Sequence, residues 1–172
     1  MRVKNIGLAA MFIAIGMILP FFTGQIPQIG NMLLPMHIPV FICSYICNWK
    51  YGAFVGFTLP LLRSVTFGMP MLYPNAIAMA VELAVYGLVA GFIYGLAKRQ
   101  NLATIYFSLV AAMISGRVIW GIVQIILLGI AGNAFTWKMF AAGAFINAIP
   151  GILLQLILIP AIVARIKPKE IK

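Results

Sequence analysis

The sequence predicts an all-α membrane protein of six transmembrane helices, built as a single domain over residues 1–172. Hydrophobic residues make up 64% of the chain and charged residues only 8%, whereas soluble proteins carry about 25% charged residues. A water-soluble fold of this length could not bury so much apolar surface, but a lipid bilayer accommodates it. Because a spanning helix needs about 20 residues, a chain of this length holds six helices and little else.

Charges and Pro/Gly clusters divide the apolar residues into separate runs. The expected helices cover residues 5–22, 34–49, 52–62, 75–97, 103–130 and 140–164. The third is expected to be short because Arg63 follows it at once, and Gly68, Pro70 and Pro74 predict a loop over residues 64–74. The first run resembles a signal peptide but has no small-residue cleavage site after it, so we expect a retained helix.

The net charge of +10 is better explained by membrane topology than by nucleic-acid binding, since the basic residues are spread over the ends of the apolar runs. If six helices alternate in direction, nine basic residues fall on one side of the membrane, and only Lys138 and Arg63 lie on the other. The nine are Arg2, Lys4, Lys50, Lys98, Arg99, Arg165, Lys167, Lys169 and Lys172. The positive-inside rule then predicts that both termini are cytoplasmic.

Polar residues within the apolar runs are candidates for a functional site, because an ionisable side chain in the bilayer costs about 2.5–3.5 kcal/mol. At about 1.5 Å per residue, Glu82, Arg117 and Asn147 each lie about 10 Å below the outer membrane face. Arg63 lies about 18 Å above the inner face. Four helices thus place polar groups in the outer third of the membrane.

Helical spacing groups further residues with these charges. Residues 75, 79, 82 and 86 share one face of their helix, and residues 117, 120 and 124 share a face of the next. The pattern predicts a polar, aromatic-lined site for a small molecule, open to the outside. The expected substrate-binding residues are Arg63, Arg117, Asn75, Glu82, Tyr86, Trp120, Gln124, Asn147 and Tyr73, with His37 and Gln28 closing the site.

Each of these residues also has a purely structural interpretation. Glu82 and Arg117 could form a structural ion pair, since buried charges are usually paired. Arg63 could extend its charge to the membrane interface. Tyr86, Trp120 and His37 could be ordinary packing residues.

No motif for catalysis or for an energy source is present. The sequence has no P-loop, and one His with two acidic residues cannot form a metallohydrolase cluster. Cys43 and Cys47 are interpreted as small apolar residues on one helix face. We therefore expect no enzyme activity, no metal and no cofactor, and energy supplied by a partner. The alternatives are a stand-alone proton-coupled carrier that uses Glu82, and a structural membrane protein without a ligand.

Helix 5–22 carries a candidate partner surface. Gly7, Ala10 and Ala14 are small residues three and four positions apart, a spacing that lets another helix approach closely. Such spacings also arise by chance in Ala-rich membrane helices.

Several segments together resemble the S components of energy-coupling factor (ECF) vitamin transporters, in their pantothenate-type branch. Ala10-xxx-Ala14 is similar to the family's contact with its membrane coupling subunit. The middle of the chain supplies the more specific segments, LPMHIPV at 34–40, WKYG at 49–52, PLLR at 60–63, GMP at 68–70, YP at 73–74 and ELAVYGLVAG at 82–91. The resemblance covers essentially the whole chain.

The resemblance implies a multi-pass protein of the bacterial plasma membrane that captures a vitamin outside the cell. It implies a six-helix fold, a site roofed by the loops after the first and third helices, and partnership with a membrane coupling subunit and two cytoplasmic ATPases. Two arginines near the expected site suit a carboxylate ligand such as pantothenate. Other vitamins carried in the family, such as folate or riboflavin, remain alternatives.

Overall fold

The structure is a computed structural model that describes residues 2–23, 33–97, 99–132, 136–143 and 148–166. These residues form seven α-helices and no strand. The helices are α1 Arg2–Ile18, α3 His37–Cys47, α4 Trp49–Phe67, α5 Ile77–Leu96, α6 Leu102–Ile130, α7 Trp137–Ala141 and α8 Ile149–Ile166, with a 3₁₀ turn, η1 Leu19–Thr23, and a π turn, η2 Leu72–Ala76.

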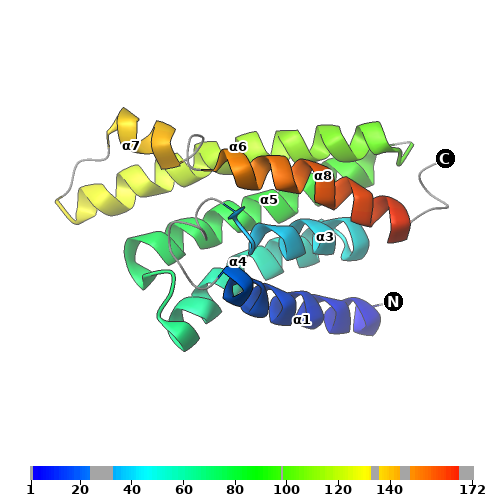
Figure 1. The fold of residues 1–172 in the computed structure, drawn as a ribbon, viewed down its shortest axis with the longest axis horizontal. Helices are drawn as coiled ribbons and strands as arrows, with labels where there is room; N and C mark the ends of the chain where they lie inside the picture. The colour runs from blue at the N-terminus through cyan, green and yellow to red at the C-terminus, as the bar shows by residue number, and fades with distance from the viewer. Residues whose placement is uncertain (1, 24–32, 98, 133–135, 144–147, 167–172) are drawn as a thin grey trace.

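The long helices run side by side along the long axis of the molecule, and α3 lies at their centre (Figure 1). Every α3 residue except Ile46 is buried, and the helix contacts α1, α4, α5 and α8. A helix that is apolar on nearly all sides suits such a central position.

The molecule has an apolar core that also contains polar side chains, and its outer surface carries many large apolar side chains. Among the described residues, nine polar or charged residues are buried: His37, Ser44, Arg63, Ser64, Glu82, Ser108, Arg117, Gln124 and Gln155. The outer faces of α6 and α8 carry exposed apolar side chains such as Ile114, Ile122 and Ile157. This distribution is expected where lipid is the solvent, so the chain is a multi-pass membrane protein.

Four stretches are long and apolar enough to cross a membrane by length and composition, namely Val3–Phe22, Leu72–Leu96, Leu102–Ile130 and Ile149–Ile166. α4 has 19 residues but is not among them, and α3 is a shorter apolar helix of 11 residues. The expected count of six spans therefore stays a prediction.

The expected lengths of the second and third helices are wrong. α3 is short because the backbone turns at both of its ends: φ is 50° at Leu34 and 111° at Asn48, whose side chain caps the N–H of Trp49. α4 is the long one, since it continues past Arg63 and ends only at Gly68, which has a φ of 70°. An αL glycine commonly ends a helix in this way.

The expected helix over residues 140–164 is described only in part: α7 ends at Ala141, α8 begins at Ile149, and residues 144–147 lie outside the described residues. Pro150 is the second residue of α8. A proline is well placed in the first turn of a helix, where its missing N–H has no partner to lose, but it disrupts a helix interior. Pro150 is therefore compatible with its place in the first turn of α8.

Four glycines let α4 and α5 pack closely. Gly52 and Gly56 lie four residues apart on α4, and Gly87 and Gly91 lie four apart on α5. A Cβ added at Gly87 would overlap the backbone of Gly52, and one at Gly56 would overlap the backbone of α5 at Leu83. Close crossings of membrane helices depend on such small residues.

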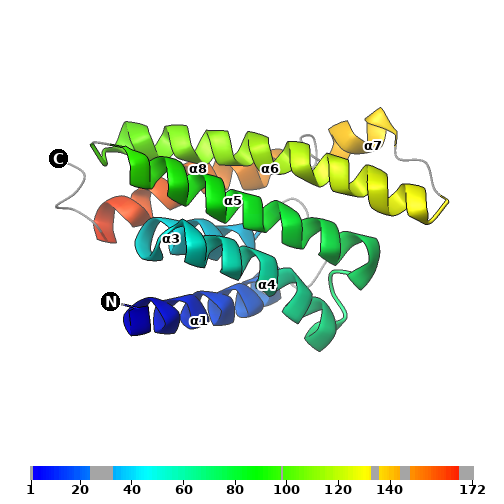
Figure 2. The same ribbon diagram turned by 180° about the vertical axis from the view of Figure 1, so that it is seen from behind.

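The start of α1 and the end of α8 lie at one end of the bundle, called here the terminal end; α7 lies at the opposite end, the α7 end (Figures 1 and 2). The start of α4 and the turn between α5 and α6 are also at the terminal end. Basic residues at these positions include Arg2, Lys4, Lys50, Arg99 and Arg165. This grouping agrees with the expected charge asymmetry, although the cytoplasmic location of this end stays a prediction.

Candidate functional site

The carboxylate of Glu82 is the centre of a buried polar cluster formed by α3, α5 and α6. Its Oε1 lies 3.1 Å from Nη1 of Arg117 and accepts a 2.8 Å hydrogen bond from the Tyr86 hydroxyl. Nε2 of His37 lies 3.8 Å from the same oxygen. All four side chains are buried. The expected association of Glu82 with Arg117 thus appears as a direct contact.

Local sequence explains how these groups meet. Glu82 and Tyr86 are one helical turn apart on α5, so the tyrosine reaches the carboxylate of its own helix. Gly116 precedes Arg117 on α6, and a Cβ at that position would overlap the Tyr86 ring. The glycine therefore allows α6 to approach α5 closely enough for Arg117 to contact Glu82.

α3 contributes its N-terminal end to this cluster. His37 is its first residue, and the His37 ring lies 5.2 Å from the Tyr86 ring. Phe41 also packs on Tyr86, with ring centroids 5.2 Å apart and an interplanar angle of 20°. Helix N-termini carry a partial positive charge, which favours the nearby carboxylate.

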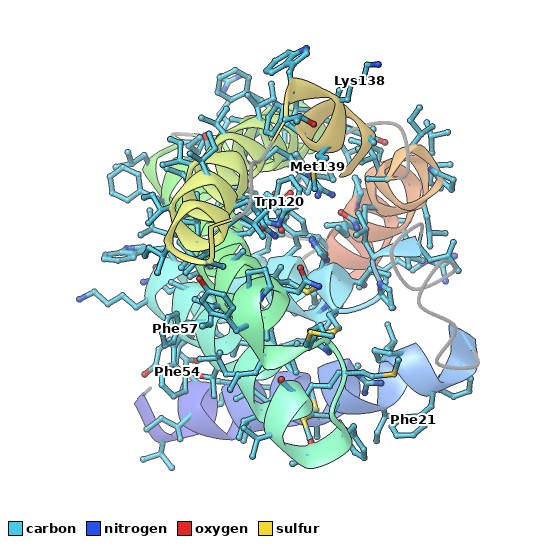
Figure 3. The ribbon with its side chains drawn as sticks, turned by 90° about the vertical axis from the view of Figure 1, so that its left-hand side faces the viewer. Phe21, Phe54, Phe57, Trp120, Lys138 and Met139 are labelled. Carbon is cyan, nitrogen blue, oxygen red and sulfur yellow. The ribbon has the colours of Figure 1, made fainter. Side chains whose placement is uncertain are left out.

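On α6 the polar face continues from Arg117 toward the α7 end. Gln124 is 5% exposed, and its Oε1 has no hydrogen-bond partner within the described part of the chain. Trp120 lies between Arg117 and Gln124 in sequence and is half-buried. In Figure 3, which looks onto the α7 end, Trp120 and Met139 lie between α6, α7 and α8. Phe54 and Phe57 instead lie on the outer side of α4.

α7 places aromatic rings over this face. Phe140 stacks on Trp120 with centroids 6.3 Å apart, and Trp137 follows at 5.2 Å from Phe140. A Cβ at Gly121 would overlap the Phe140 ring, and one at Gly143 would lie 2.8 Å from the Trp120 ring. Phe140 is not among the site residues expected from the sequence, although the two glycines and the aromatic residues at 137 and 140 were an available signal.

Arg63 is not part of the Glu82 cluster. Its guanidinium donates a hydrogen bond to the carbonyl of Met17 and lies 5.1 Å and 5.2 Å from the Phe21 and Phe67 rings. These two rings contact each other edge to face, 5.0 Å apart. Arg63 thus joins the end of α4 to the end of α1. The side chain of Arg63 is 3% exposed, so its charge is buried within the protein.

The other expected site residues lie either at the α7 end or outside the described residues. Asn75 and Tyr73 belong to η2 and are exposed, and the Tyr73 hydroxyl donates to the carbonyl of Leu127 on α6. Gln28 and Asn147 lie outside the described residues. Gln155 was not among the expected residues, yet it is 1% exposed, and its Nε2 lies 3.5 Å from the carbonyl of Leu34, just before α3.

One side of α1 is exposed and the other packs on the bundle, as a partner surface on this helix requires. Gly7, Ala10 and Ala14 are exposed, and a Cβ at Gly7 would meet no atom within 4 Å. Ala9 and Phe12 face the bundle core. An exposed row of small residues leaves room for another helix.

The arrangement of these side chains is suited to binding a small molecule. Among the described residues, no group of three or more His, Cys, Asp or Glu side chains could hold a metal ion. The cluster presents a guanidinium, an imidazole, an amide and aromatic rings from four elements. Such a mixture of apolar surface and a few polar groups is typical of small-molecule sites.

Comparison with known families identifies the class of protein. The sequence matches the family described as "ECF transporter, substrate-specific component" over residues 4–163. Searches of curated proteins and of solved structures found no match. The family match covers nearly the whole chain and agrees with the buried polar cluster in a membrane bundle. The chain belongs to the family of substrate-specific components of ECF transporters.

Proposed function

We propose that the cluster around Glu82 and Arg117 is the ligand site of this ECF component, and that the ligand is an anionic vitamin, with pantothenate as the first candidate. Membership of the family makes the chain the substrate-specific subunit of a micronutrient transporter and not an enzyme. The identity of the ligand, the side of the membrane from which it binds and the residues that contact it are our proposal.

The observation that carries the proposal is a pair of buried polar side chains on α6, Arg117 and Gln124. Arg117 contacts Glu82 through Nη1, and a guanidinium has five N–H donors in all. One turn of helix beyond Trp120, the buried Oε1 of Gln124 has no partner among the described residues. A ligand carboxylate could accept hydrogen bonds from Arg117, and a ligand hydroxyl or amide N–H could donate a hydrogen bond to Oε1 of Gln124. Pantothenate carries all three functions.

The proposed ligand site predicts a loss of affinity in Gln124→Ala. Removing one hydrogen bond to a buried ligand group costs about 1.4 kcal/mol, which corresponds to about tenfold in Kd. Isothermal titration of pantothenate into the purified protein in detergent measures this difference. The matched control is Ile125→Ala, the next residue on α6, whose side chain is 57% exposed and faces away from the cluster.

Equal affinities in Gln124→Ala and the unaltered protein would contradict the proposed site. Binding of folate or riboflavin in place of pantothenate would correct the ligand but keep the site. Native mass spectrometry of protein purified from cells identifies the retained metabolite without a prior choice of ligand.

We further propose that the exposed small residues of α1 contact a membrane coupling subunit, which two ATPases drive. Vesicles that contain this chain alone should then bind pantothenate but not accumulate it, with or without a pH gradient. Filtration assays with radiolabelled pantothenate measure this, and vesicles that also contain the coupling subunit and the ATPases provide the positive control. Accumulation driven by a pH gradient in the chain alone would support a stand-alone carrier instead.

A further inference from the structure

The Glu82 cluster is electrically balanced before any ligand arrives. Arg117 contributes one positive charge and Glu82 one negative charge, at 3.1 Å. Arg63 lies against α1 and η1 and does not offset this balance. His37, the first residue of α3, lies beside this pair and carries a positive charge only when its ring is protonated.

An anionic ligand at Arg117 would disturb this balance. The cluster would then hold two carboxylates and one guanidinium, all shielded from water by buried side chains. An uncompensated buried charge is strongly unfavourable, and proteins usually relieve it by moving a proton. The question is which group accepts that proton.

His37 is placed to accept it. The side chain is 1% exposed, and neither ring nitrogen has a hydrogen-bond partner among the described residues. Its Nε2 lies 3.8 Å from Glu82 Oε1, a distance that becomes an ion pair when the ring is protonated. A neutral imidazole has one N–H, whereas the imidazolium has two and can serve a carboxylate on each side.

The groups that surround His37 come from every neighbouring element. α5 supplies Glu82 and Tyr86, and α6 supplies Arg117, which contacts Glu82. On the α8 side, Gln155 lies 3.5 Å from the carbonyl of Leu34, which also accepts the backbone N–H of His37. The positive charge of Arg117 opposes protonation of the ring, and the negative charge of Glu82 favours it. A second carboxylate at Arg117 would shift the balance toward the protonated ring.

We propose that binding of a carboxylate ligand takes up one proton onto His37, so that the site gains no net charge. The proton comes from water, one N–H bond forms at the imidazole, and no bond of the ligand breaks. The inference rests on the proposed function, because it assumes an anion at Arg117. Since a proton is taken up on binding, affinity is greater at low pH.

The test compares pantothenate with pantothenol, in which an uncharged CH₂OH group replaces the carboxylate. Calorimetric titrations in two buffers of different ionisation enthalpy give the number of protons taken up. We expect one proton for pantothenate and none for pantothenol. The Kd of pantothenate should rise by about tenfold per pH unit between about pH 6 and pH 8, while that of pantothenol stays constant.

His37 can be observed directly, because it is the only histidine in the sequence. Protein labelled with ¹⁵N-histidine and freed of any polyhistidine tag should show a neutral ring before pantothenate is added and an imidazolium after. Two variants separate the possible acceptors. Glu82→Gln removes the negative charge, so pantothenate binding should take up no proton. His37→Gln should also abolish proton uptake, whereas uptake that persists in this variant would assign the proton to Glu82 and overturn the inference.

Other outcomes are equally decisive. Pantothenate binding without proton uptake, and with an unchanged histidine spectrum, would overturn the inference while leaving the proposed function intact. Binding of pantothenol alone would show that the balanced cluster excludes an anion. An absence of heat with both compounds would overturn the inference together with the choice of pantothenate.

Discussion

Replacing Arg117 by alanine should destabilise the folded protein by about 3–5 kcal/mol, because it leaves Glu82 as a buried charge without its partner. The contact is short, at 3.1 Å, and both side chains are buried. The remaining hydrogen bond from Tyr86 does not replace a full positive charge. We expect a markedly lower temperature of thermal aggregation, measured by gel filtration after heating in detergent.

A double substitution tests whether the pair causes the loss. Arg117→Ala with Glu82→Ala removes both charges, so it should be more stable than Arg117→Ala alone, even though it removes more atoms. Lys138→Ala is the matched control, since this residue is an exposed cation on α7. If the two single losses simply add in the double variant, Glu82 and Arg117 do not interact energetically and the cluster has been described wrongly.

The second large effect is expected at the crossing of α4 and α5. Gly87→Ala should destabilise the protein by about 3 kcal/mol, since the new methyl group would overlap the backbone of Gly52. Backbone atoms in the middle of two packed helices cannot move aside as a flexible side chain can. The expected observation is a loss of monodisperse protein after purification.

Gly95→Ala is the control for this substitution. Gly95 lies two turns further along the same helix, and a Cβ there would meet no atom within 4 Å. This variant should be as stable as the unaltered protein or slightly more so, because alanine favours helix by up to about 1 kcal/mol over glycine. Equal stability of Gly87→Ala and Gly95→Ala would mean that α4 and α5 do not approach as closely as described.

The composition and the apolar runs were sufficient to predict a helical membrane protein. The length and hydrophobicity of each run determine whether it can span a bilayer, and both are read directly from the sequence. Depth along a helix also follows from counting residues, and the equal depths expected for Glu82 and Arg117 agree with their direct contact. Depth does not specify the direction in which a side chain points. Arg63 lies in the bundle interior, but it faces α1 and not the cluster.

The interruptions of the helices could not be predicted from hydropathy. Leu34 adopts a positive φ although leucine shows no preference for it, so this turn before α3 could not be predicted from residue type. The close packing of α4 and α5, in contrast, does have a signal in the sequence, namely their glycine pairs. Gly52-xxx-Gly56 and Gly87-xxx-Gly91 are spaced for helix packing, and pairing them in advance would have required knowing that these two helices are neighbours.

The complete burial of α3 has a consequence for how the protein enters the membrane. At about 1.5 Å per residue its 11 residues extend for about 16 Å, roughly half of a hydrocarbon core. The four candidate spans are long and apolar enough to cross lipid, but α3 touches protein on nearly every side. Its insertion is therefore a folding event, completed when α1, α5 and α8 close around the α3–α4 hairpin. Biogenesis should be most sensitive to substitutions in this one segment, which the bilayer itself scarcely contacts.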